Sequence, residues 1–200
     1  MSPSFDPRAL VLEGAHARIE PLAREHAAGL FAAGADATIW RYLPRPPFAS
    51  LVDVLATIDA ALAAASSGGE VPFAIVARAD GTVAGSTRFL DIRREDRALE
   101  IGWTWLGTPW QRGALNTECK YLLLRHAFEG LGAVRVQLKT DRRNERSQRA
   151  IERLGAVREG TLRRQRLTWD GVWRDTVYYS VVDSEWPAVR ERLEGLLARR

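Results

Sequence analysis

One stretch constrains the fold more than any other: an extended apolar run that leads through a tight turn into a long apolar helix. The run is Leu99 to Leu106, and the helix opens within Trp110-Gln111-Arg112-Gly113-Ala114-Leu115-Asn116-Thr117 and reaches about Phe128. The first-turn N–H groups of such a helix have no helical partners, and its macrodipole adds positive potential there. The segment therefore predicts an anion site suited to a pyrophosphate, with the charge of Arg112 beside it. Taken alone, it fits an ordinary strand–helix connection equally well.

Length and composition indicate one globular domain spanning residues 1–200. The hydrophobic content is 46% and the charged content 27%, with a single cysteine. One cysteine allows neither an intrachain disulfide nor a thiolate metal cluster, which favours a reducing, cytoplasmic location. The segment Met1 to Asp6 lacks the apolar core of an export signal, and no apolar run reaches the ~20 residues of a membrane span. We expect no membrane partner.

The charge balance argues against a nucleic-acid partner. The 29 basic residues are interleaved with 25 acidic ones, which is typical of a solvated surface. The densest basic stretches are 141–146 and 163–166, and such clusters could equally meet the phosphates of a cofactor. An arginine-rich nucleic-acid-binding module is kept as the rival from another class.

Periodicity, turn signals and helix caps predict a mixed sheet with helices packed on it. The predicted strands span residues 17–22, 73–77, 82–89, 98–106, 133–140, 157–167 and 172–182. The predicted helices span about 25–33, 51–65, 113–128, 144–154 and 187 to the C-terminus.

The stretch from Thr38 to Phe48 has too much proline for a helix and is unusually aromatic. A packed surface loop is one interpretation. We favour the wall of a substrate cleft, because loops on a rigid scaffold often carry specificity. The predicted substrate-binding residues are Trp40, Tyr42, Leu43 and, on the strand before the turn, Trp103.

The segment Trp105 to Ala156 resembles the acyl-CoA core of the GNAT N-acetyltransferase superfamily. Its second half carries Asn144-Glu145-Arg146-Ser147, followed by Ala150-Ile151-Glu152-Arg153-Leu154-Gly155. The stretches Trp40-Arg41-Tyr42-Leu43-Pro44 and Asp170 to Ser180 resemble its RimJ/RimL-like branch. The resemblance implies the α/β (α+β mixed) GNAT fold, with a mixed, mostly antiparallel sheet of about seven strands flanked by helices.

The resemblance also implies the reaction and the cofactor contacts. It implies acetyl transfer from acetyl-CoA to a primary amine by direct attack in a ternary complex, without a metal. The amine would be an N-terminal α-amine of a protein or peptide, or a small amine. The implied acyl-CoA contacts are Thr104, Trp105, Leu106, Gln111, Arg112, Gly113, Ala114, Leu115, Asn116, Thr117, Asn144 and Ser147.

Four positions depart from the family pattern. Ala114 and Asn116 occupy positions where the family favours bare backbone, although Gly113 lies beside them. Ile151 stands where many relatives carry a general-acid tyrosine, and Arg166 falls where the branch carries a glutamate base.

Three residues are therefore the catalytic candidates. Glu100 is the first candidate base, Asp175 the second, and Ser147 would assist the departing thiolate. An α-amine, with a pKa of about 8, needs less help from a base than a lysine amine near 10.4. Each candidate has a structural alternative: an ion pair for Glu100, a hydrogen-bonded carboxylate for Asp175, and a satisfied helix terminus for Ser147.

Two other interpretations share the fold. One is a different acyl donor, such as succinyl-CoA, whose extra carboxylate would meet arginines. The other is a non-catalytic acyl-CoA-binding protein, suggested by the missing tyrosine and glutamate. The sequence leaves open the identity of the amine and whether the protein is a monomer or a homodimer.

Overall fold

A computed structural model describes residues 5–199. Met1 to Ser4, part of the segment predicted to lack an export signal, lie outside the described residues. The strands are β1 (Leu12–Glu13), β2 (Ala17–Pro21), β3 (Val71–Ala77), β4 (Val83–Arg93), β5 (Ala98–Leu106), β6 (Arg135–Asp141), β7 (Val157–Leu167) and β8 (Trp173–Val182). The helices are α1 (Ala27–Ala33), α2 (Leu51–Ser66), α3 (Ala114–Arg125), α4 (Glu145–Leu154) and α5 (Trp186–Ala198).

The strands form one eight-stranded sheet in the order β1-β2-β3-β4-β5-β6-β8-β7. Six of the neighbouring pairs are antiparallel, and only β5 and β6 are parallel. The predicted mixed, mostly antiparallel sheet is confirmed. It has one strand more than expected because the short β1 pairs with β2.

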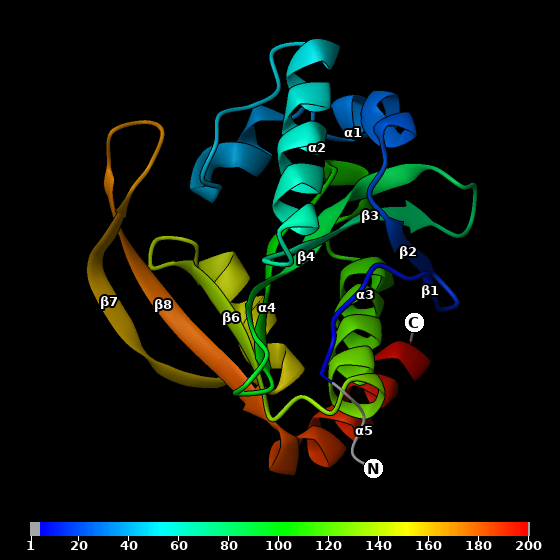
Figure 1. The fold of residues 1–200 in the computed structure, drawn as a ribbon, viewed down its shortest axis with the longest axis vertical. Helices are drawn as coiled ribbons and strands as arrows, with labels where there is room; N and C mark the ends of the chain where they lie inside the picture. The colour runs from blue at the N-terminus through cyan, green and yellow to red at the C-terminus, as the bar shows by residue number, and fades with distance from the viewer. Residues whose placement is uncertain (1–4, 200) are drawn as a thin grey trace.

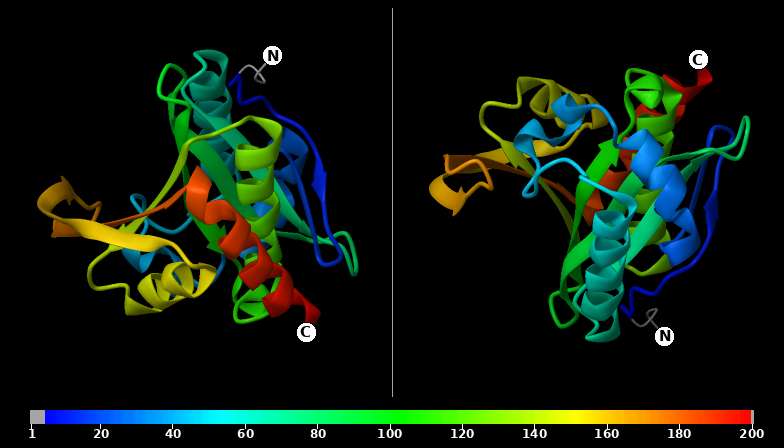
Figure 2. Two further views of the ribbon diagram at one scale, coloured as in Figure 1. Left: turned by 90° about the horizontal axis from the view of Figure 1, so that it is seen from below. Right: turned by 90° about the horizontal axis from the view of Figure 1, so that it is seen from above.

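Helices cover both faces of this sheet (Figures 1 and 2). The larger core joins one sheet face to α3, α4 and α5, through residues such as Leu122, Ile151 and Leu193. The smaller core joins the other face to α1 and α2, through residues such as Leu30 and Ile58. The site-bearing strands are therefore held rigidly from both sides.

The predicted helix caps are present. The Ser50 hydroxyl accepts a hydrogen bond from the Asp53 N–H at 3.2 Å and starts α2. Asn144 Oδ1 accepts from the Ser147 N–H at 3.1 Å and starts α4. Gly155 ends α4 with φ 103°, a left-handed conformation that favours glycine.

Three helical details differ from the sequence predictions. A 3₁₀ helix spans Ala37–Tyr42, within the stretch predicted to be too proline-rich for a helix, because its prolines come only after Tyr42. The helix predicted from residue 25 begins as a 3₁₀ turn, Arg24–His26. The last turn of the long apolar helix widens to a π-helix over His126–Gly130.

The two parallel strands at the centre of the sheet separate along their length. Their pairing runs from Ala98↔Arg135 to Glu100↔Gln137 and ends there, although β5 continues to Leu106 and β6 to Asp141. Beyond Glu100, the β5 backbone facing β6 is left to bond to a ligand or water. The separation opens toward the start of α3.

The β7–β8 hairpin projects away from the rest of the molecule (Figures 1 and 2). β7 is one of the two edge strands of the sheet, and all of its residues except the half-buried Thr161 are exposed. Within residues 5–199, no helix combines the length and apolar character that crossing a membrane requires.

Candidate active site

The start of α3 lies just beyond the open end of β5. Gly113 is its N-cap, with φ −96° and ψ −169°, and its cap has no side-chain hydrogen bond. A Cβ built on Gly113 would meet no atom within 4 Å. The side of Gly113 on which a side chain would lie is therefore open, as an anion site at this helix start requires. This geometry fits the pyrophosphate of an acyl-CoA.

The turn before α3 is held in a strained conformation by its neighbours. Arg112 has φ 62°, which costs a non-glycine residue about 1–2 kcal/mol. The Gln111 amide donates to the Leu106 carbonyl at 2.8 Å and accepts from Arg146 Nη1 at 2.7 Å. Gln111 therefore braces the turn between β5 and α4, so its side chain is committed to the protein.

Two arginines of α4 reach the start of α3: Arg146, which belongs to the basic stretch 141–146 noted in the sequence, and Arg153, which the sequence analysis did not select. Arg146 bonds to Gln111, and Arg153 Nη2 donates to the buried Thr117 hydroxyl at 3.2 Å. Arg153 Nε is buried and has no hydrogen-bond partner in the described part of the chain. Their spacing of seven places them on one face of α4, a signal that was available in the sequence.

Ser147 lies in the first turn of α4, next to Arg146. It lies four residues before the buried Ile151 and so shares its helix face. Its backbone N–H bonds to Asn144, and its side chain is half-buried. The hydrogen bond from Arg146 to Gln111 places the start of α4, which carries Asn144 and Ser147, next to the turn 111–117.

Glu100 occupies the point at which β5 and β6 separate. Its side chain is 2% exposed, and Oε2 contacts Lys139 Nζ at 2.8 Å and accepts from Gln137 Nε2 at 3.0 Å. Oε1 lies against Gly102, where an added Cβ would come within 2.6 Å of it. Lys139 in turn lies over the Tyr178 ring, 5.9 Å from its centroid. Lys139 and Tyr178 complete a polar cluster that the sequence analysis did not find.

Asp175 lies on the opposite face of the sheet from Glu100. Glu100 pairs with Gln137, which pairs with Ser180 on β8. Alternation along β8 places Asp175, five residues before Ser180, on the other face. Its Oδ1 accepts from the Arg164 N–H at 2.8 Å, so Asp175 anchors the β7 backbone.

A bulge in β5 determines where the residues after Glu100 point. The register slips by one residue between Gly102 and Trp105, and Trp103 has φ 51°. As a result, Trp105 packs into the α1–α2 core and Leu106 into the α3 core. The Thr104 hydroxyl accepts from Lys120 Nζ at 2.6 Å, so only the Thr104 main chain is available for a cofactor.

Lys120, a buried lysine on α3, was not singled out by the sequence analysis. The pKa of Lys120 is lowered to about 8 because the side chain is buried. The nearby Cys119 and Glu100 act in the opposite direction and raise the pKa, but their effect is smaller. The folded protein thus releases this proton near pH 8, whereas the unfolded chain keeps it until about pH 10.4. Between these values the unfolded state binds more protons, so folding stability gains with rising pH.

We therefore expect the stability of the parent, relative to that of Lys120→Met, to rise between about pH 8 and 10.4. Subtracting the free energy of unfolding of Lys120→Met from that of the parent cancels the contribution of the titratable groups that both proteins share. Urea unfolding at several pH values measures it. Parallel stability curves across this range would show that Lys120 titrates like an exposed lysine.

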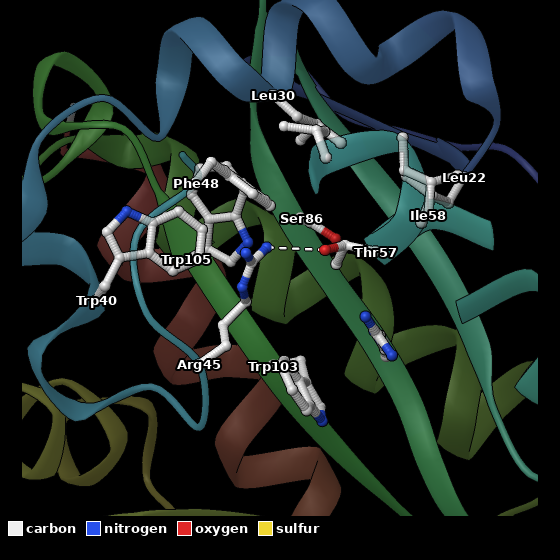
Figure 3. A pocket seen from close by; sticks show the side chains of 12 residues that line it. Leu22, Leu30, Trp40, Arg45, Phe48, Thr57, Ile58, Ser86, Trp103 and Trp105 are labelled. Carbon is white, nitrogen blue, oxygen red and sulfur yellow. Dashed lines mark hydrogen bonds between the residues drawn. The ribbon is translucent and has the colours of Figure 1, made fainter. Parts of the chain in front are cut away.

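The aromatic stretch forms a wall of a small cavity between α2 and the sheet (Figure 3). Trp40 is 1% exposed, donates from Nε1 to the Gly34 carbonyl at 2.8 Å, and packs edge-on against Phe48. Arg45 stacks 3.9 Å from the Phe48 ring centroid and donates to Thr57 at 2.9 Å. The cavity holds about 20 Å³, enough for one water molecule.

Of the predicted substrate-binding residues, Trp40 is thus buried, while the other three are half-buried. Tyr42 lies 5.7 Å from the Arg143 guanidinium, and Trp103 lies 4.7 Å from that of Arg88. Leu43 packs against the α1–α2 core. Tyr42 and Trp103 are the members of the set whose rings remain partly open to a ligand.

We expect Trp40→Ala to destabilise the fold by about 3–5 kcal/mol, because it removes a fully buried indole and leaves a cavity. Tyr42→Ala is the matched control, because it removes an aromatic side chain from a half-buried position. We expect it to lower the free energy of unfolding by less than Trp40→Ala does. Chemical denaturation of both variants measures this difference. Equal losses would mean that Trp40 does not anchor this loop.

Among residues 5–199, no group of three or more His, Cys, Asp or Glu side chains is arranged to hold a metal ion.

A family model described as "Acetyltransferase (GNAT) domain" matches residues 16–157. The chain therefore belongs to the GNAT family of N-acetyltransferases, in its RimJ/RimL-like branch.

Individual relatives agree with this assignment. A solved structure from T. thermophilus, titled as a "putative acetyltransferase", is 45% identical, covering 94% of this chain and 96% of that one, with TM-score 0.85. The Bacillus subtilis protein named "Putative ribosomal N-acetyltransferase YdaF" is 32% identical over 54% of this chain, a match that spans only 57% of that protein. Mycobacterium smegmatis RimJ in complex with CoA-disulfide is 20% identical, with 98% and 97% coverage and TM-score 0.81, and supports the fold alone.

Proposed function

We propose that this N-acetyltransferase transfers the acetyl group of acetyl-CoA to a primary amine by direct attack within a ternary complex. The observation that carries the proposal is the junction of β5 and α3, where the helix start has no side-chain cap and a Cβ on Gly113 would meet no atom within 4 Å. The N–H groups of Ala114, Leu115 and Asn116 would bind the pyrophosphate. Arg112, Arg146 and Arg153 add positive charge around it.

The thioester supplies an activated acetyl group. The β5 backbone beyond Glu100, at Thr104 and Trp105, would hydrogen-bond the pantetheine arm, as an added strand would. Asn144 and Ser147 would line the other side of the arm from the start of α4.

Glu100 is the proposed base. Because its side chain is 2% exposed, we propose that it takes one proton from the substrate ammonium through one water molecule. The lone pair of the neutral amine then forms the N–C bond. The C–S bond breaks, its electron pair leaves with the sulfur, and the thiolate takes up the second proton that the nitrogen loses on becoming an amide. Ser147 would donate a hydrogen bond to the departing sulfur. Asp175 is not proposed as the base, because it faces away from Glu100 and anchors β7.

The acceptor is proposed to be an N-terminal α-amine of a protein or peptide, or a small amine. The name of the B. subtilis relative points to ribosomal proteins, and an α-amine suits a site with one buried base because its pKa is about 8. Incubation with acetyl-CoA and libraries of peptides and small amines, followed by mass spectrometry, tests this. We expect singly acetylated products. CoA binding without transfer to any amine would instead support the non-catalytic binder.

The alternative donor, succinyl-CoA, is tested in the same assay. Lys139 is paired with Glu100 and Arg143 with Asp141, at 2.8 and 2.7 Å, so these two cations are not available for an extra carboxylate on the donor. We therefore expect acetyl-CoA to be preferred.

A further inference from the structure

Two arginines lie directly opposite each other on the β7–β8 hairpin. Arg166 of β7 is in register with Arg174 of β8. Like charges that face each other across neighbouring strands destabilise a sheet. The two guanidinium groups repel each other, and the positive charge of Arg166 therefore lowers the pKa of Arg174. The pair therefore needs a counter-charge.

Arg174 is buried without an adequate partner. It is 8% exposed, and its buried Nε has no hydrogen-bond partner among the described residues. Burial is the largest effect that lowers the pKa of Arg174, and the charge of Asp141 opposes it. The Asp141 carboxylate, however, already accepts three hydrogen bonds from Arg143, at 2.7 to 3.0 Å. An incompletely paired, buried guanidinium is costly unless an anion binds it.

Arg174 shares a sheet face with the proposed base. Glu100 is in register with Gln137, and Gln137 with Ser180. Arg174 precedes Ser180 by six residues, so alternation returns it to the same face. The charge of Glu100 also acts on Arg174, raising its pKa. An acceptor whose amine approaches Glu100 would therefore extend toward this arginine pair.

We propose that Arg174, with Arg166 beside it, binds an anionic group of the acceptor, so that the preferred acceptor is an amine that also carries a carboxylate or phosphate. The planar guanidinium forks can bind such a group through two parallel hydrogen bonds. This inference rests on the proposed function, because it names the class of amine that the same site accepts.

Such an anionic amine could be a peptide with acidic side chains or a small aminocarboxylate, and two pairs of matched acceptors distinguish these possibilities. The first pair is a short peptide with a free N-terminus and glutamates at its second and third positions, beside the same peptide with glutamines. The second pair is a small aminocarboxylate beside its amide. Each is assayed with acetyl-CoA and with succinyl-CoA, using the parent, Arg174→Met, Arg174→Lys and Arg163→Met. Arg163→Met removes the same charge from an exposed position of the same hairpin.

In the parent we expect a lower KM for the anionic member of at least one pair. Arg174→Met should raise that KM about tenfold or more, because a charge-assisted bond is lost. The kcat and the KM for the amide acceptor should stay close to the parent values. Arg174→Lys should retain part of the preference, and Arg163→Met all of it. If Arg174→Met does not fold, by circular dichroism, Arg166→Met at the exposed partner position is used instead.

In the kinetic assay, three results would overturn the inference: no preference in the parent, an equal rise in KM for anionic and amide acceptors, or an effect that follows succinyl-CoA rather than the acceptor. Calorimetric titration of the acidic peptide into the CoA-bound protein separates this inference from the proposed function. Arg174-dependent binding without turnover would contradict the transfer reaction alone. No Arg174-dependent binding would overturn the anion site.

Discussion

Replacing Glu100 by glutamine is expected to lower kcat/KM for acetyl transfer by about 100-fold or more at pH 7. Glutamine keeps the size of the side chain and its contacts with Gln137 and Gly102 but cannot take a proton. The loss should shrink as the pH rises past about 8, where an α-amine loses its own proton. The measurement is the pH–rate profile of the variant beside that of the parent.

The control for this prediction is Glu159→Gln. Glu159 also bonds to a cation on β6, Arg135, and to Ser180 on β8, but at an exposed position. Its loss should leave the pH–rate profile unchanged. If Glu100→Gln has the profile of the parent, Glu100 is not the base, and deprotonation by bulk water becomes the better account.

Gly113→Val is expected to weaken CoA binding by about 10- to 100-fold, because the branched side chain would occupy the space that the pyrophosphate needs next to the α3 N–H groups. The fold should tolerate the change. The Gly113 φ of −96° suits valine, and an added Cβ meets no protein atom within 4 Å. Isothermal titration calorimetry with CoA measures the affinity, and thermal unfolding checks the fold.

Gly160→Val is the matched control for this variant. Gly160 lies in β7, and a Cβ there also meets no atom within 4 Å. It is exposed on the edge strand β7, whereas the predicted pyrophosphate site follows β5, so CoA affinity should be retained. If Gly113→Val and the parent bind CoA with equal affinity, the pyrophosphate does not bind at the start of α3.

Local sequence signals predicted much of the fold because each acts over a few residues. The caps Ser50 and Asn144 and the stop at Gly155 are satisfied by backbone groups within three residues. The strand 98–106 was predicted with its observed bounds, because a buried strand reads as an apolar run bounded by turns.

Placements that depend on distant contacts could not be predicted in the same way. The bulge at Trp103 reverses the alternation of β5, so the faces occupied by Trp105 and Leu106 cannot be obtained by counting from Glu100. The depth of Trp40 depends on Phe48 and Trp105 closing over it. The separation of Asp175 from Glu100 follows from the register of β6 with β8, which no local pattern encodes.

The polar groups around the candidate site were missed for a similar reason. In the sequence, nothing marks Lys120 as different from the other polar residues of its helix. Its hydrogen bond to Thr104 of β5 becomes apparent only in the folded structure. Lys139 and Tyr178 lie far apart in the sequence and meet because β6 and β8 pair in register. The contacts of such charged side chains depend on which strands lie beside them, and a local sequence pattern does not contain that information.

A crystal structure of this protein with bound CoA tests most directly the claim that acyl-CoA binds where β5 and β6 separate. The pyrophosphate oxygens should lie about 3 Å from the backbone nitrogens of Ala114, Leu115 and Asn116. The pantetheine arm should run along β5 with its thiol toward Glu100. A pyrophosphate bound elsewhere, with the start of α3 contacting only solvent, would contradict the account.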